Sequence, residues 1–494
     1  MFPTLHQIHT RVVLTELSET LQRRATLDDV PDELLDELAQ QGATWLWLLG
    51  VWQTGPAGQE KSRSSADWRA GFLEDLPDYT DFDICGSPFA ICGYAPHSDF
   101  GGAESLARFR ERLRTRSIQL MLDFVPNHVA LDHRWVDEHP EYFIQGSEQE
   151  LRAEPQNYVR IGDKIFAHGR DPYFPGWRDT LQLNYRHAGL RQAMTDVLLN
   201  LTTMCDGVRC DMAMLLLPNV FKRTWGDRSQ PSDGSDPIDS PFWPEAIQAV
   251  RAHRDDFLFL SEVYWDLEAT LQAQGFDYTY DKSYYDRLCT GDAEAVRDHL
   301  TADFEFQRKC ARFLENHDEQ RAAAVFDPAM NEAAAVLTYT VPGLRFFHEG
   351  QFDGRRKRMN LHLSRKAEEF PNPLVRDFYR RMLTCLRRNE FREGRWKLLS
   401  HHAAWAENPT WRNFVAYEWR NDDHEKTWIV VNYGRTQGQC YVELGDESLR
   451  GQSLLLRDQM SRAWYQRDGY ELCDRGLYLD LPAWGYHIFD VTVT

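Results

Sequence analysis

The sequence lacks the features of exported, disulfide-bonded or membrane-spanning proteins. Residues 1–10 contain no basic start followed by an apolar core, so they do not read as a signal peptide. No apolar run approaches the roughly 18 residues that a membrane-spanning helix requires. The nine cysteines are odd in number and form no C-x-x-C pair, which argues against a disulfide framework or a zinc site. We therefore expect a cytoplasmic protein with free thiols and no membrane partner.

Basic residues are fewer than acidic residues. The chain has 56 Lys and Arg against 76 Asp and Glu, a formal net charge of −20. Because nucleic acids and anionic membranes attract clusters of Lys and Arg, this balance excludes them as main partners. Aromatic residues, in contrast, are abundant at 13%. Most of them belong to the core, but flat rings also suit sugars, which combine apolar faces with hydroxyl edges.

Short apolar runs of the β type alternate with helical patterns along the first 390 residues. Buried parallel strands read as near-continuous apolar runs. Eight strand–helix alternations are typical of a (β/α)8 barrel, the TIM barrel. The eight expected strands are residues 44–49, 89–94, 118–125, 205–212, 257–264, 276–282, 312–318 and 344–349.

The rhythm is broken in two places. The third and fourth expected strands are too far apart for a single connecting helix, which indicates a small inserted domain. After residue 391, short alternating strands indicate a C-terminal antiparallel β-sandwich domain. The expected α/β fold therefore has a barrel from residues 1–128 and 205–391, an inserted domain at 129–204 and a C-terminal domain at 392–494.

Carboxylates follow several of these strands, and the carboxyl ends of barrel strands meet at one mouth. Arg209 and Asp211 share one face of a strand, so the guanidinium should lower the pKa of Asp211 and keep it ionised, as a nucleophile requires. Glu262 follows the apolar run FLFLS at 257–261, and desolvation there should raise its pKa, as a proton donor requires. Two carboxyls with these roles, about 5–5.5 Å apart, make a retaining glycosidase.

Four segments carry a family resemblance: DFVPNH at 123–128, DGVRCD at 206–211, LSEV at 260–263 and ENHD at 315–318. They resemble, in order and on the expected strands three, four, five and seven, the signature regions of the α-amylase superfamily, glycoside hydrolase family 13. The resemblance spans the whole chain. It implies a retaining hydrolase that acts on α-1,4-linked glucooligosaccharides or α-glucan through a covalent glycosyl-enzyme.

The resemblance also assigns roles to individual residues. It implies that Asp211 is the nucleophile, Glu262 the general acid/base and Asp318 the carboxylate that grips the sugar beside the reacting carbon. The implied sugar contacts are Arg209, His128, His317 and Tyr94. Asp123 and Asn127 resemble the polar pair that links the third strand to the inserted domain.

Two positions depart from the family pattern. Gln182 stands where a calcium-binding Asp is often found, and a hard cation prefers carboxylate oxygens. We therefore expect no cofactor and doubt a structural calcium ion beside Asn127. After the nucleophile, the Lys-His pair of many α-amylases is absent, so the acceptor side of the site differs from theirs.

Four basic residues follow the eighth expected strand, at 355–358. Arg355, Arg356 and Arg358 could contact a phosphate or another acceptor at the mouth, and the simpler interpretation is a solvated charge run. The same triad serves a hydrolase, an α-glucan transglycosylase and a sugar phosphorylase. Phe242-Trp243 and the segment 274–276 also resemble the maltosyltransferase branch weakly. A non-catalytic binding subunit is the remaining alternative.

Overall fold

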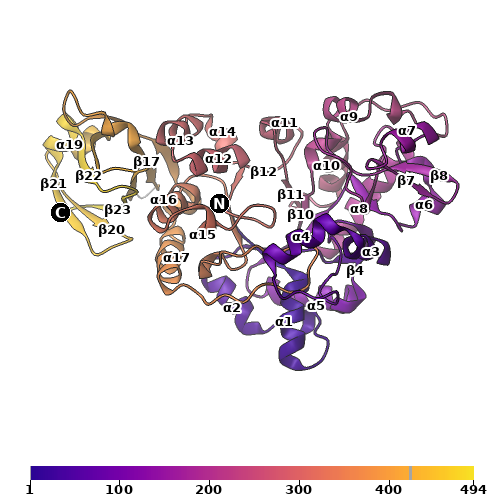
Figure 1. Ribbon diagram of the computed structural model, residues 1–494. Helices are drawn as coiled ribbons and strands as arrows, with labels where there is room; N and C mark the ends of the chain where they lie inside the picture. The colour runs from indigo at the N-terminus through magenta and orange to yellow at the C-terminus, as the bar shows by residue number, and fades with distance from the viewer. Residues whose placement is uncertain (1, 422–424) are drawn as a thin grey trace.

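A closed barrel of parallel strands forms the middle of the molecule (Figure 1). The computed structural model describes residues 2–421 and 425–494, and within them eight strands pair in the order β1-β14-β13-β12-β11-β10-β5-β2. The strands are β1 (Thr4–His9), β2 (Trp45–Leu49), β5 (Gln119–Phe124), β10 (Gly207–Cys210), β11 (Leu258–Ser261), β12 (Tyr278–Tyr280), β13 (Cys310–Arg312) and β14 (Leu344–His348). The barrel closes because β1 pairs with both β2 and β14.

Amphipathic helices cover the outside of this barrel. They include α1 (Thr10–Leu21), α2 (Asp32–Gln40), α5 (Gly102–Arg114), α8 (Ala188–Met204), α10 (Phe242–His253), α12 (Lys282–Thr290), α16 (Pro328–Tyr339) and α17 (Pro373–Leu386). In α17 the buried residues recur at helical spacing, for example Phe378, Met382 and Leu386, so one stripe of the helix packs on the core. None of the helices in the described part of the chain is both long and apolar enough to cross a membrane.

The fold prediction is confirmed, but its first two strands are assigned wrongly. The first barrel strand is β1, which the sequence analysis missed, and the run at 89–94 is not a barrel strand. Instead, β4 (Ile91–Pro96) pairs with β3 (Trp52–Thr54) outside the barrel. The reason is physical: β1 carries polar residues that face the barrel mouth, such as Gln7, and so has no continuous apolar run.

A segment inserted between β5 and α8 lies at the right of Figure 1. It contains two antiparallel strand pairs, β6 (His128–Ala130) with β9 (Thr180–Gln182) and β7 (Tyr158–Ile161) with β8 (Lys164–Ala167). The short helices α6 (Trp135–Glu138) and α7 (Glu148–Ala153) complete it. Helix α8 follows this segment and packs between α5 and α10 in the helix layer of the barrel.

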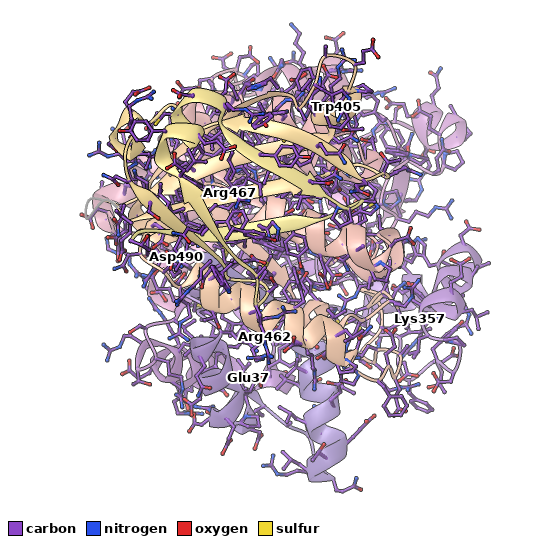
Figure 2. The ribbon with its side chains drawn as sticks, turned by 90° about the vertical axis from the view of Figure 1, so that its left-hand side faces the viewer. Glu37, Lys357, Trp405, Arg462, Arg467 and Asp490 are labelled. Atoms are coloured by element: carbon purple, nitrogen blue, oxygen red, sulfur yellow. The ribbon has the colours of Figure 1, made fainter. Side chains whose placement is uncertain are left out.

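The C-terminal region lies at the opposite end of the molecule, in yellow in Figure 1, and Figure 2 views it from the front. Within its described residues, two antiparallel sheets face each other, ordered β15-β17-β18-β23-β20-β21 and β16-β19-β22. Their bounds are β15 (Arg395–Leu398), β16 (Ser400–Ala403), β17 (Phe414–Arg420), β18 (Lys426–Asn432), β19 (Gly438–Glu443), β20 (Ser453–Asp458), β21 (Trp464–Asp468), β22 (Leu477–Leu481) and β23 (Tyr486–Val493).

Side chains alternate between the two faces of the larger sheet. Phe414 and Ala416 of β17 lie in the core between the two sheets. Val415, Tyr417 and Trp419 of the same strand point the other way, into the hydrophobic core of the barrel. The C-terminal sheets are therefore packed against the barrel along a shared apolar face.

Candidate functional site

The two residues expected to do the chemistry lie side by side at the barrel mouth. Asp211 directly follows β10 and Glu262 directly follows β11, and these strands are neighbours. Both carboxylates bind one guanidinium: Arg209 Nη1 lies 2.6 Å from Asp211 Oδ1, and Arg209 Nη2 lies 2.8 Å from Glu262 Oε2. Main-chain hydrogen bonds from Asp211 N to Phe124 O and from Glu262 N to Cys210 O fix both residues at the strand ends. The arrangement holds two carboxyls at a common point of the mouth.

Arg209 is held in place by the side chains around it. It is fully buried, and its guanidinium lies over the rings of Trp47, Phe89 and Tyr280 at 5.1, 5.2 and 5.8 Å. Arg209 Nε also donates to the Tyr280 hydroxyl at 3.3 Å. Planar contacts of this kind suit arginine better than lysine. The guanidinium is therefore a fixed positive charge between the two carboxylates.

Glu262 has both carboxylate oxygens in hydrogen bonds. Tyr264 Oη lies 2.8 Å from Oε1, and the main-chain N–H of Met212 donates to Oε2 at 2.7 Å. Burial raises the pKa of Glu262 to about 7, against the opposing charge of Arg209. A carboxyl with this pKa can both give and take a proton near neutral pH.

Asp211 differs from the expectation in the direction of its pKa. Burial raises the pKa of Asp211, and the Arg209 guanidinium opposes the rise without reversing it. The predicted lowering is therefore wrong in net direction, because the sequence does not show how deeply the residue is buried. Among the described residues, Asp211 Oδ2 has no hydrogen-bond partner, so one oxygen is held by Arg209 and the other is free.

Asp318 completes the group and is the most accessible of the three carboxylates. Its side chain is 42% exposed, against 5% for Asp211 and 3% for Glu262. His317 Nε2 lies 3.0 Å from Asp318 Oδ2. Although burial acts in the opposite direction, His317 and the charges of Arg209 and Arg358 lower the pKa of Asp318 to about 2. Asp318 is therefore an ionised hydrogen-bond acceptor that a ligand can reach.

Two of the remaining predicted sugar contacts, His128 and Tyr94, are already packed against or hydrogen-bonded to other parts of the protein. His128, in β6, is buried next to Trp177 with a ring-centroid distance of 5.1 Å, and burial lowers its pKa to about 3. The hydroxyl of half-buried Tyr94 bonds both the N–H and the C=O of Val125 at 2.9 Å. A sugar could therefore meet the Tyr94 ring, while its hydroxyl is engaged by the main chain.

Asp123 and Asn127, the predicted structural pair, bind two different segments of the chain. Asp123 accepts from Trp47 Nε1 at 3.1 Å and from the N–H of Gly50 at 2.8 Å, so among the described residues its side chain binds β2 and the residue that follows it. Asn127 does bind the inserted segment, through Gln182 of β9. The sequence shows Asp123 at a strand end but not which neighbour it meets.

The side chains beside Asn127 do not fit a calcium ion. Gln182 Nε2 donates at 3.0 Å to both the carbonyl oxygen and Oδ1 of Asn127, and Asn127 Nδ2 donates back to Gln182 Oε1 at 3.2 Å. The amide N–H groups thus point at the oxygens that a cation would bind. In the described residues, no group of three or more His, Cys, Asp and Glu side chains is arranged to hold a metal ion.

The basic run at 355–358 is only partly directed at the site. Arg355 lies near Asp353 at 3.7 Å, and the guanidinium of Arg356 donates to Ala323 O. Arg358 is half-buried, and its charge is among those that lower the pKa of Asp318. Of the three predicted arginine contacts, Arg358 is thus the one that acts on the carboxylate cluster.

Sequence reasoning missed several residues that touch this cluster, among them Gln7, Phe89 and Tyr264. Gln7 lies on the unrecognised strand β1 and contacts His317. Phe89 covers both Arg209 and His317, with a ring-centroid distance of 5.6 Å to the latter. Tyr264 could have been found from its place two residues after Glu262, since alternate residues share one face of an extended chain.

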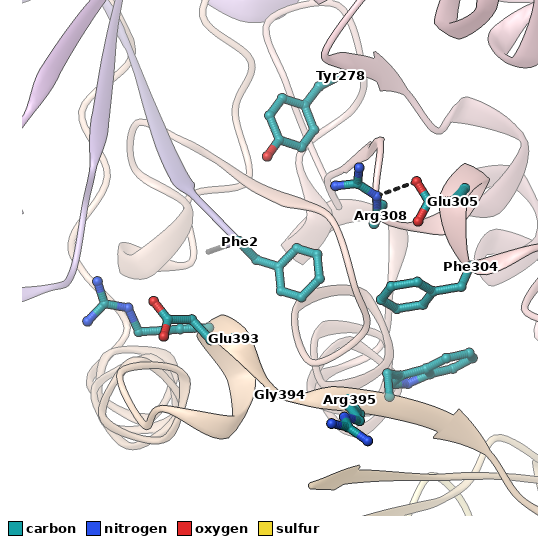
Figure 3. Close-up of a pocket in the computed structure, with 10 residues that line it drawn as sticks. Phe2, Tyr278, Phe304, Glu305, Arg308, Glu393, Gly394 and Arg395 are labelled. Atoms are coloured by element: carbon teal, nitrogen blue, oxygen red, sulfur yellow. Dashed lines mark hydrogen bonds and ion pairs between the residues drawn. The ribbon is translucent and has the colours of Figure 1, made fainter. Parts of the chain in front are cut away.

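A cavity of about 510 Å³ lies at the other end of the barrel, and Figure 3 shows side chains that line it. Phe2, Tyr278 and Phe304 line it, with the ion pair between Arg308 and Glu305 beside them. These residues precede or begin barrel strands, so the cavity opens on the N-terminal face, where TIM barrels do not carry chemistry. We therefore place the functional site at the carboxylate cluster.

The chain is similar in sequence to known proteins. The family model described as "Alpha amylase, catalytic domain" matches residues 94–383, more than half of the chain. "Alpha-amylase MalA" of Haloarcula japonica is 26% identical over 389 residues, which are 76% of this chain and 47% of that protein. "Alpha-1,4-glucan:maltose-1-phosphate maltosyltransferase" of Burkholderia pseudomallei is 26% identical over 273 residues, 53% of this chain and 20% of that protein. The chain spans about half, or less, of the length of these curated relatives.

Solved structures show the same architecture from end to end. The maltogenic α-amylase AmyB of Thermotoga neapolitana superposes with a TM-score of 0.69 at 17% identity, over 100% of this chain and 99% of that one. An α-amylase of Lactobacillus plantarum gives 0.68 at 20% identity, over 99% of each chain. Similarity at this level of identity shows the fold alone. The match of the catalytic-domain model to more than half of the chain goes further, and by it this chain belongs to the α-amylase family.

Proposed function

We propose that the chain is a retaining α-glycoside hydrolase that acts on α-1,4-linked glucooligosaccharides or α-glucan. The observation that carries the proposal is the single guanidinium of Arg209, which holds Asp211 and Glu262 together at the mouth. A nucleophile needs a free oxygen, and Asp211 Oδ2 accepts no hydrogen bond from the described residues. A general acid needs a raised pKa, and burial gives one to Glu262.

The proposed reaction is a double displacement. Asp211 Oδ2 attacks the anomeric carbon while Glu262 gives its proton to the departing glycosidic oxygen. The bond to the leaving group breaks and a covalent bond to Asp211 forms. Glu262, now a carboxylate, then takes a proton from a water molecule whose oxygen displaces Asp211. Two inversions restore the α configuration at the reacting carbon.

In this proposal the other polar side chains at the mouth hold the sugar. The accessible, ionised Asp318 accepts hydrogen bonds from the hydroxyls next to the reacting carbon, with His317 beside it. His128, Arg209 and Tyr94 supply further contacts around the same ring. Asp123 and Asn127 act indirectly, because they anchor the segments that carry these residues.

Transfer to an acceptor other than water is the second candidate. It is favoured by the similarity to a maltosyltransferase and by the half-buried Arg358 near Asp318, which could meet a phosphate. A sugar hydroxyl as acceptor gives a transglycosylase, and inorganic phosphate gives a phosphorylase. The grouping of Asp211, Glu262 and Asp318 at one mouth argues against a non-catalytic binding subunit.

The test is product analysis on maltooligosaccharides by NMR, with and without phosphate. We expect the α anomer to appear first, and a β anomer would overturn the retaining mechanism. Longer oligomers than those supplied would identify transfer, and glucose 1-phosphate formed only with phosphate would identify phosphorolysis.

Asp211→Asn tests the nucleophile. We expect activity to fall about 10³-fold or more, because the amide cannot form the covalent intermediate. Asp163→Asn is the matched control, since that side chain is 92% exposed in the turn between β7 and β8. Undiminished activity of Asp211→Asn would exclude the assignment.

We also propose a cytoplasmic location. All nine cysteines lie in the described part of the chain and carry free thiols, six of them buried. Free thiols persist in a reducing compartment.

A further inference from the structure

Gln7 reaches from β1 across the barrel mouth to a histidine more than 300 residues away in sequence. Its side chain is fully buried, and Nε2 lies 2.8 Å from His317 Nδ1. On the other side of the same imidazole, His317 Nε2 lies 3.0 Å from Asp318 Oδ2. The three side chains therefore form a line from the amide through the ring to the carboxylate.

For a neutral imidazole, the contacts at its two nitrogens favour one placement of the ring proton. A neutral imidazole has one N–H, and an ionised carboxylate can only accept. A carboxylate oxygen 3.0 Å from Nε2 would repel a lone pair there, so the N–H of the neutral ring belongs on Nε2, although it is not aligned as a hydrogen bond, and Nδ1 must accept. The amide N–H group of Gln7 is the donor that Nδ1 needs, whereas the amide oxygen in its place would demand a second proton on the ring.

The ring itself is fixed by packing. Trp47 meets His317 edge-on, with a ring-centroid distance of 5.4 Å and an interplanar angle of 89°, and Phe89 covers it at 5.6 Å. His317 is also buried. Packing therefore sets where the ring lies, but apolar contacts do not choose between its two nitrogens.

We propose that Gln7 is a positioning residue that holds His317 in the Nε2–H tautomer and so orients Asp318 toward a bound sugar. The link from Asp318 to the sugar rests on the proposed function. The tautomer of His317 does not, because it follows from what each of the two ring nitrogens contacts.

The decisive measurement is NMR of the protein labelled with ¹⁵N-histidine, in which the two ring nitrogens report which of them carries the proton. The His317 signals are identified by their loss in His317→Asn. We expect the Nε2–H tautomer in the unmodified protein. A proton on Nδ1 would overturn the proposal whatever the enzyme activity turns out to be.

Two variants at Gln7 separate its role from simple packing. Gln7→Met keeps the length but cannot donate, so we expect the tautomer preference to weaken. Gln7→Glu can only accept, so we expect a proton to appear on Nδ1. For both variants we expect kcat/KM on maltooligosaccharides to fall about tenfold, because Asp318 loses its fixed partner.

Gln351→Met is the matched control. Gln351 is an equally buried glutamine on the same face of the barrel, and its Nε2 donates to Tyr339 and Tyr379 at 2.7 and 2.8 Å. We expect this change to lower the melting temperature but to leave the His317 tautomer unchanged. An unchanged tautomer in both Gln7 variants would overturn the proposal, and a changed tautomer without any glycosidase activity would instead count against the proposed function.

Discussion

Among the described residues, Glu262 has two side-chain partners, the predicted Arg209 and the hydroxyl of Tyr264, which was not predicted. Tyr264 Oη lies 2.8 Å from Glu262 Oε1, while Oε2 is bound by Met212 N and Arg209. An O–H that donates to a carboxylate stabilises the ionised form and so lowers the pKa of that carboxyl. Tyr264 therefore opposes the rise in pKa that burial causes.

Tyr264→Phe should move the pH dependence of the enzyme in a definite direction. Without the donor the ionised form of Glu262 is less stable, so its pKa rises further above about 7. Because the proposed acid must be protonated in the free enzyme, the basic limb of kcat/KM should shift upward by about 0.5–1 pH unit. We expect kcat at neutral pH to fall about three- to tenfold, since the acid is then less exactly held.

Tyr185→Phe is the control for this variant. Tyr185 is also buried, but its hydroxyl has no hydrogen-bond partner among the described residues, so its removal should leave the pH profile in place. A downward shift of the basic limb in Tyr264→Phe, or no shift, would mean that Tyr264 does not act on Glu262.

At the scale of single elements, the sequence predicts best where one physical signal dominates. The strands at Trp45–Leu49 and Gln119–Phe124 are almost wholly buried, so their apolar runs identify them. Strand β1 fails this test because Gln7 and His9 face polar neighbours. The run at 89–94 is apolar for another reason, since Phe89 covers Arg209 at the mouth.

The residues of the site also differ in whether a local sequence pattern identifies them. The three carboxylates were predictable because each follows a strand or a motif of the family. Gln7 and Tyr264 were not, because a hydrogen bond between residues far apart in the chain, or its direction, leaves no local pattern. Whether the pKa of Asp211 is raised or lowered depends on how deeply the residue is buried. The periodicity of the sequence indicates burial only coarsely.

The junction of β6 with β9 depends on the paired amides of Asn127 and Gln182. Gln182→Leu has a similar size but leaves the buried Oδ1 of Asn127 without a donor among the described residues, at about 1–3 kcal/mol for an unsatisfied group. We expect a clear loss in the free energy of unfolding, measured by denaturant titration. Gln192→Leu is the control, because that exposed residue bonds only Asp196 on the surface of α8.

The same junction predicts the response to chelators. Because Gln182 occupies the oxygens of Asn127 with N–H donors, we expect EDTA to leave the melting temperature unchanged. A fall of several degrees that calcium restores would show that an ion binds there after all.

At the scale of the whole molecule, the C-terminal β domain is bound to the barrel by more than a linker. Trp419 Nε1 donates to Thr340 O at 2.6 Å, and the Tyr417 hydroxyl lies 2.6 Å from Thr340 Oγ1. Both rings belong to the same hydrophobic cluster as the barrel strands. Arg388 of the barrel side also pairs with Asp490, which is labelled in Figure 2. We infer that separating the two parts would expose the apolar surface between them and break these hydrogen bonds.

We therefore expect one cooperative unfolding transition by calorimetry, with loss of the C-terminal fold and of activity at the same temperature. Trp419 and Trp428 test this, since both are fully buried, Trp419 against the barrel and Trp428 between the two C-terminal sheets. Replacing either by Ala should cost about 3–5 kcal/mol. If the parts are coupled, Trp428→Ala lowers the single transition just as Trp419→Ala does. If they are independent, Trp428→Ala instead makes the C-terminal domain unfold at a lower temperature, while the barrel and its activity persist. The apolar contact between the barrel and the C-terminal domain would then have no role in stability.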